Sequence, residues 1–234
     1  MNHDVTESKE LRQLEPLGQL RPINYYHEGD TVPYWSHLPY ISRYTQAVPV
    51  QQSLLELLQG GGYILYARHA EANVGADQPN LSLQDCTTQR NLSDFGRSQA
   101  ATYGEAIRRA RIPVMYPVVA SPFCRTRETA DWAFGGDYVQ IDPFLIDIYR
   151  LNGNLSPTEQ RRILTNLQSY LEVEPTLGNN KVIIAHSFPS GVGLNSLPNM
   201  GTVVVRPRGE GNGYDVVGHL AFENMVNWVS SNVD

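Results

Sequence analysis

Residues 63–69 read YILYARH, and this stretch decides the fold. Its first five residues are apolar and largely β-branched or aromatic, and Gly60-Gly61-Gly62 precedes them, which together predict a short buried strand. Arg68 and His69 follow where the strand should leave the core. A short strand that is apolar on both faces is typical of a parallel sheet covered by helices on each side.

Short β-rich runs alternate with helical segments on either side of this strand. We expect a helix over residues 54–58, further strands at 117–120, 138–141, 181–185, 202–205 and 214–217, and helices at 93–110, from about 125, at 157–171 and after 220. This alternation predicts an α/β fold, a three-layer α/β/α sandwich with a mainly parallel central sheet. In such sheets ligands bind beyond the carboxyl ends of the strands.

The chain of 234 residues, 41% of them hydrophobic, is long enough for one domain with a sizeable core and an extension. Residues 1–50 are polar and aperiodic but rich in tyrosine and proline, so we expect an aromatic N-terminal extension that packs on the domain. It would serve as a brace or as part of the wall of the active site. Residues 51–234 form the predicted catalytic domain.

Composition excludes several classes of function. The formal charge is −6 and the pI is near 5.5, so neither nucleic acid nor an anionic membrane is an expected partner. No apolar run approaches a membrane span, and the first 30 residues lack the pattern of a secretory signal, so we expect a cytoplasmic protein. Its two cysteines, Cys86 and Cys124, are expected to be reduced. No histidine or cysteine spacing predicts a metal site.

Polar residues follow three of the predicted strands. Arg68 and His69 follow the first, Arg125 lies just beyond the strand at 117–120, and His186 with Ser187 follows the strand at 181–185. Parallel strands would bring these side chains to one edge of the sheet. Arginine forks bind the oxygens of a phosphoryl group, and a neutral imidazole can attack its phosphorus atom. The pattern therefore predicts a site that handles phosphoryl groups.

Four motifs together resemble the histidine phosphatase superfamily, which includes the phosphoglycerate mutases. Residues 66–71 (YARHAE) resemble its Arg-His-Gly-Glu signature, and residues 91–100 (NLSDFGRSQA) its Leu-Ser-x-x-Gly-x-x-Gln-Ala helix start. Residues 121–130 (SPFCRTRETA) resemble its Ser-Ser-Pro-x-x-Arg-Ala-x-x-Thr-Ala element, and residues 182–186 (VIIAH) its strand ending in a second histidine. The resemblance runs from about residue 60 to 186 and implies a phosphoglycerate mutase-like fold.

The resemblance implies catalytic roles for the same residues that the strand ends single out. His69 would be the nucleophile that forms a phosphohistidine, and Arg68, Arg125 and His186 would bind the phosphoryl oxygens and stabilise the transition state. Residues 143–148 (PFLIDI) resemble the family's Pro-x-Leu-x-Glu-Ile stretch, which makes Asp147 the candidate general acid.

Other residues near the predicted pocket are weaker candidates. Glu71 is the alternative general acid, and Asn73 and Ser187 are held in reserve as polar pocket residues. Ala70 stands where the family has glycine, which would matter if its φ were positive. A serine hydrolase with Ser187 as nucleophile is disfavoured, because Ala185 and Pro189 replace the small glycines that a nucleophile elbow requires.

The expected function is that of a metal-independent phosphomonoesterase, similar to the histidine acid phosphatases, that acts on a small phosphorylated substrate without a cofactor. Two alternatives are a catalytically idle sensor of a phosphate ligand and a phosphomutase. Specificity is expected to lie in the loops at 72–90 and 147–154, with Tyr149 and Arg150 near the leaving group. Neither the substrate nor the oligomeric state can be predicted from the sequence.

Overall fold

The structure is a computed structural model that describes residues 50–230. The predicted N-terminal extension therefore lies outside the described residues, apart from Val50, at which the first helix begins. Among residues 50–230, every helix is too short or too polar to span a bilayer.

A six-stranded sheet forms the centre of the described domain, in the order β3-β2-β4-β1-β5-β6. The strands are β1 (Ile64–Arg68), β2 (Val114–Ala120), β3 (Val139–Ile141), β4 (Asn180–Ala185), β5 (Thr202–Pro207) and β6 (Tyr214–Leu220). The pairs β3-β2, β2-β4 and β4-β1 are parallel, whereas β5 is antiparallel to both of its neighbours. The predicted mainly parallel sheet is confirmed.

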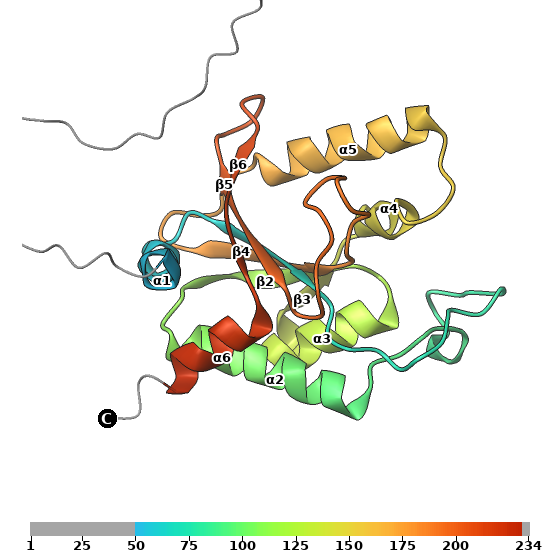
Figure 1. Ribbon diagram of the computed structural model, residues 1–234, viewed down its shortest axis with the longest axis horizontal. Coiled ribbons are helices and arrows are strands. Elements are labelled where there is room, and N and C mark those ends of the chain that lie inside the picture. The colour runs from blue at the N-terminus through green and yellow to red at the C-terminus, as the bar shows by residue number, and fades with distance from the viewer. Residues whose placement is uncertain (1–49, 231–234) are drawn as a thin grey trace, which may run out of the picture. The chain divides into compact units, whose positions relative to one another are not determined.

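Helices cover both faces of the sheet and make the predicted three-layer sandwich (Figure 1). The helices are α1 (Val50–Gly60), α2 (Asp94–Arg109), α3 (Cys124–Phe134), α4 (Leu145–Arg150), α5 (Pro157–Leu171) and α6 (Phe222–Ser230). Figure 1 shows α2, α3 and α6 on one face and α4 with α5 on the other. The sequence did not predict α4, whose last residues were expected to begin a loop.

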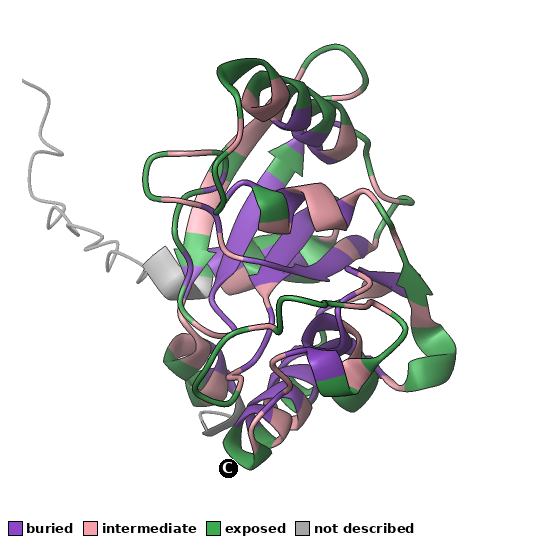
Figure 2. Ribbon diagram, turned by 90° about the vertical axis from the view of Figure 1, so that its right-hand side faces the viewer, coloured by how far each residue is buried: buried purple, intermediate pink, exposed green. Residues whose placement is uncertain are grey.

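Alternation along the strands divides the core into two layers. In β1, Leu65 and Ala67 pack with the cluster that includes α2, α3 and α6, while Ile64 and Tyr66 pack with α4 and α5. Side chains of a strand point alternately to opposite faces, so a strand covered on both sides must be apolar throughout. The buried residues are accordingly concentrated in the central strands (Figure 2).

The starts of two helices follow directly from their sequences. Ser93 caps α2 by accepting a hydrogen bond from the Gly96 N–H, and Ser156 and Glu159 form a capping box at α5, where Pro157 is the first helical residue. Gly96 has a further role, because a Cβ atom there would lie 2.0 Å from the carbonyl oxygen of Glu71. The start of α2 is thereby held against the segment that follows β1.

The expectation that both cysteines are reduced is wrong in this structure, because Cys86 and Cys124 form a disulfide. Cys86 begins a short 3-10 helix, Cys86–Thr88, in the long loop between β1 and α2, and Cys124 is the first residue of α3. The bond was missed because the two residues, 38 positions apart, show no pattern in sequence. It ties the loop to the end of α3 that carries Arg125.

We predict that the disulfide stabilises the fold measurably. Closing a loop of 38 residues reduces the entropy of the unfolded chain enough to stabilise the protein by about 3–4 kcal/mol. The free energy of unfolding, measured by urea denaturation, should fall by this amount when dithiothreitol is added. The Cys86→Ser variant should be equally destabilised and insensitive to dithiothreitol. Equal free energies of unfolding with and without dithiothreitol would contradict the prediction.

Candidate active site

A cavity of about 170 Å³ lies where β1 and β4 end. The side chains that line it come from these strand ends, the β1–α2 loop, α3 and the region of α4; they are Arg68, His69, Arg90, Arg125, Tyr149, Asn152, His186 and Ser187. Three of the eight are arginines and none is acidic. In a chain whose formal charge is −6, this cavity is locally cationic and suited to an anion.

The parallel pairing of β1 with β4 brings the two predicted histidines together. Arg68 is level with Ala185, and the N–H of His69 donates to the Ala185 carbonyl at 2.9 Å. His69 and His186 each come one residue after this level pair. Their ring centroids are 5.6 Å apart and the rings meet edge to face.

Hydrogen bonding fixes the tautomer of His69. Its Nδ1 lies 2.7 Å from the carbonyl oxygen of Ala70, and since a carbonyl only accepts, Nδ1 must carry the proton. The lone pair is therefore on Nε2. Burial, and next the positive charge of Arg125, lower the pKa of His69 to about 3, so the ring is neutral at physiological pH.

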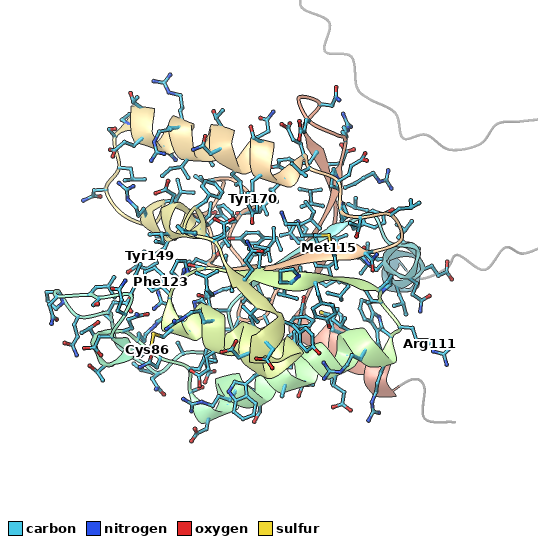
Figure 3. The ribbon with its side chains drawn as sticks, turned by 180° about the vertical axis from the view of Figure 1, so that it is seen from behind. Cys86, Arg111, Met115, Phe123, Tyr149 and Tyr170 are labelled. Atoms are coloured by element: carbon cyan, nitrogen blue, oxygen red, sulfur yellow. A yellow bond between two sulfur atoms is a disulfide. The ribbon has the colours of Figure 1, made fainter. Side chains whose placement is uncertain are left out.

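His186 is enclosed by polar and aromatic neighbours. Its Nε2 lies 3.1 Å from the Ser121 hydroxyl, and its ring packs against Phe123 at 4.8 Å and Tyr149 at 5.2 Å between centroids. Phe123 and Tyr149 lie next to each other in Figure 3. Burial, followed by the neighbouring His69, holds the pKa of His186 well below its usual value. Both histidines are thus neutral at physiological pH.

The arginines carry buried positive charge. Arg68 donates to the Leu197 carbonyl at 2.7 Å, and its pKa is lowered by burial and by the positive charges of Arg90 and Arg125. The Nε atoms of Arg68 and Arg125 are buried and have no hydrogen-bond partner among the described residues. Unpaired buried donors are costly, so an anion with several oxygens would stabilise this arrangement.

The threonine of the third motif links two parts of the site. Thr129 in α3 accepts a hydrogen bond from the Ala70 N–H at 3.1 Å and donates to the Arg125 carbonyl at 2.7 Å. It therefore joins the residue after His69 to the helix that bears Arg125. Ala70 is not among the described residues with positive φ, so the alanine fits without backbone strain.

Neither predicted general acid lines the cavity. The carboxylate of Asp147 forms ion pairs with Arg150 at 2.9 Å and Arg162 at 3.3 Å. Glu71 accepts a hydrogen bond from the Ser93 hydroxyl at 2.8 Å, next to the start of α2. Both carboxylates are thus engaged with other side chains and are not among the lining residues.

Of the weaker candidates, some line the cavity and others do not. Ser187 lines the cavity, where its hydroxyl accepts from the Leu197 N–H, whereas Asn73 donates to the Leu92 carbonyl and is not among the lining residues. Tyr149 lines the cavity as expected, but Arg150 is engaged with Asp147 and Glu159.

Sequence reasoning missed three residues of the site. Arg90 and Asn152 line the cavity, and Asp77 binds the guanidinium of Arg125 at 2.9 Å. Arg90 and Asp77 belong to the aperiodic β1–α2 loop, where no spacing indicates which side chains turn inward. The only available signal was the position of Arg90 directly before the second motif.

No catalytic metal site is apparent in the part of the chain that the structure describes. Within residues 50–230, no three or more histidine, cysteine, aspartate or glutamate side chains are grouped so as to hold a metal ion. A larger cavity of about 630 Å³ is lined by the disulfide and by Arg127, but no histidine lines it.

Comparison with known proteins agrees with the site. The model of the histidine phosphatase superfamily (branch 1) matches residues 64–163, from β1 into α5. The resemblance predicted from the motifs is confirmed over these residues. This match supports a phosphatase activity. No curated protein sequence matches the chain.

Several solved structures are similar to the chain at low sequence identity. The putative phosphohistidine phosphatase SixA from Agrobacterium tumefaciens is 15% identical to this chain. The alignment has a TM-score of 0.40 and covers 68% of this chain and 98% of that one. Phosphoserine phosphatase from Entamoeba histolytica is 15% identical, with a TM-score of 0.44 over 70% and 98%. A mycobacterial glucosyl-3-phosphoglycerate phosphatase is 18% identical, with a TM-score of 0.41 over 62% and 92%.

We predict that the buried neutral His69 makes the fold sensitive to acid. Below pH 6.5 the unfolded chain binds a proton at this residue that the folded chain, with a pKa of about 3, does not. At pH 5 this difference costs about 2 kcal/mol of stability, and above pH 6.5 it vanishes. We would measure the free energy of unfolding by urea denaturation at pH 7 and at pH 5. Between these two pH values, the free energy of unfolding of His69→Asn should fall by about 2 kcal/mol less than that of the parent. His219→Asn, which removes an exposed histidine, is the control; equal losses in His69→Asn and the parent would contradict the prediction.

Proposed function

We propose that the protein is a metal-independent phosphomonoesterase, similar to the histidine acid phosphatases, that works through a covalent phosphohistidine at His69. One observation carries the proposal: a neutral histidine with its lone pair on Nε2 lies in a cavity that three arginines line. Arg68, Arg125 and His186 bind the phosphoryl oxygens. We propose a small phosphomonoester as substrate, with no cofactor and with neither nucleic acid nor a membrane as partner.

In the first step the Nε2 lone pair of His69 attacks phosphorus, a P–N bond forms, and the P–O bond to the leaving group breaks. The ring becomes positively charged as this happens. The Ala70 carbonyl, already bound to Nδ1–H, stabilises that charge without any rearrangement. In the second step water attacks the phosphohistidine, which releases inorganic phosphate and restores neutral His69.

The departing oxygen needs a proton, and we assign no side chain to this role. Asp147 is held by two arginines and Glu71 by Ser93, and neither lines the cavity. Aryl phosphates, whose leaving groups are stable as anions, are therefore the best probes of the first step. The idle phosphate sensor would use the same cavity without turnover, and a phosphomutase would return the phosphoryl group to a second hydroxyl instead of water.

The predicted cytoplasmic location stays a prediction, and the disulfide weighs against it. Disulfides such as Cys86–Cys124 persist in oxidising compartments and are rare in the reducing cytosol. The compartment in which the enzyme works should therefore be sought among the oxidising ones first.

We predict that His69→Ala lowers kcat for p-nitrophenyl phosphate at least about a thousandfold, because the substitution removes the side chain that attacks phosphorus. Phosphate release should be measured with excess chelator for the parent, His69→Ala and the control His219→Ala. The parent and the control should keep their activity with chelator present. Turnover by His69→Ala at the parental rate would exclude the mechanism, and loss of parental activity in chelator would exclude metal independence.

A further inference from the structure

The β1–α2 loop delivers one carboxylate to the edge of the cavity. Asp77 accepts hydrogen bonds from both terminal nitrogens of Arg125, at 2.9 Å from Nη1 to Oδ1 and 3.3 Å from Nη2 to Oδ2. It also accepts from the Arg90 N–H at 2.8 Å and from the Tyr149 hydroxyl at 2.9 Å. Its side chain is 10% exposed and that of Arg125 is 2% exposed, so this pair is shielded from water.

Counting the N–H groups of Arg125 shows what remains for a ligand. A guanidinium has five, on three edges. Two point to Asp77, and a third, on Nη1, points to the Arg90 carbonyl at 3.4 Å. The Nε–H, which has no partner among the described residues, and the second N–H of Nη2 remain. These two lie parallel on one edge and form a fork that fits two oxygens of a phosphoryl group.

Aromatic rings restrict the plane in which the guanidinium of Arg125 lies. Its Cζ lies 4.5 Å from the centroid of the Phe123 ring and 5.5 Å from that of Tyr149. These rings set the plane of the group, since arginine stacks on aromatic faces. Rotation within that plane is set by Asp77 and the Arg90 carbonyl.

We infer that Asp77 is a positioning residue that orients Arg125, so that the Nε–Nη2 edge is presented to the phosphoryl group. Asp77 and the substrate then bind different edges of one guanidinium at the same time. This inference rests on the proposed phosphatase function. Burial favours the protonated carboxyl, but the hydrogen bonds from Arg90, Arg125 and Tyr149 outweigh it and hold the pKa of Asp77 below its usual value, so the carboxylate is charged.

The opposite role makes a different prediction. If Asp77 competed with phosphate for Arg125, removing its charge would strengthen phosphate binding. If it positions Arg125, removing it leaves the guanidinium free to rotate, and both phosphate binding and turnover weaken.

The test compares Asp77→Asn with Asp85→Asn, which removes the same charge from an exposed position in the same loop. We expect Asp77→Asn to lower kcat/KM for p-nitrophenyl phosphate about 10- to 100-fold, the range typical of a misplaced catalytic group. It should also weaken binding of inorganic phosphate at least about fivefold in isothermal titration calorimetry, at a Tm near the parental one. Asp85→Asn should match the parent. Parental kcat/KM or tighter phosphate binding in Asp77→Asn would overturn the inference.

Two further measurements distinguish a failure of the inference about Asp77 from misfolding of the variant and from failure of the proposed mechanism. If Asp77→Asn does not fold, Asp77→Glu keeps the charge but displaces the carboxylate by one methylene; it should still lower kcat/KM at parental Tm, and parental kcat/KM would overturn the inference. If His69→Ala retains turnover, the proposed mechanism fails. The phosphate titrations with Asp77→Asn then still decide the role of Asp77, because they require no chemistry.

Discussion

The site depends on the register between β1 and β4. Because Arg68 is paired with Ala185, the residues that follow each strand, His69 and His186, leave the sheet at the same edge and at the same level. A shift of this pairing by one residue would point one of the two to the opposite face. The apolar faces of both strands, packed between two helical layers, oppose such a shift. Packing in the core thus fixes the geometry of the cavity.

Burial then sets the charge state of the residues that the register brings together. Surrounded by Arg68, Arg90 and Arg125 and removed from water, both histidines stay neutral, and the hydrogen bond from Nδ1 to the Ala70 carbonyl leaves the lone pair of His69 on Nε2. The cost of burying like charges is offset when a dianion enters. The site is therefore complementary in charge to an anion such as a phosphoryl group. Asp77 compensates part of the charge from outside the cavity lining.

Much of the fold and the centre of the site could be predicted from sequence, because both follow from local patterns. The apolar strands, the caps at Ser93 and Ser156, and the polar residues at the strand ends are each encoded within a few positions. The partners of Arg125 could not be predicted in this way. Asp77 and the Cys86–Cys124 disulfide depend on how a loop without periodicity folds back on α3. The ion pairs of Asp147 with Arg150 and Arg162 were likewise not predictable from the motif that singled it out.

The most direct measurement is the identification of the phosphorylated residue. The enzyme would be mixed with an aryl phosphate, quenched in alkali within milliseconds to preserve phosphohistidine, and mapped by mass spectrometry of its peptides. If His69 is the nucleophile, one phosphoryl group is found on His69, and it forms and is lost at rates compatible with turnover. A phosphoryl group on His186 or Ser187 instead, or turnover without any phosphorylated residue, would contradict this assignment.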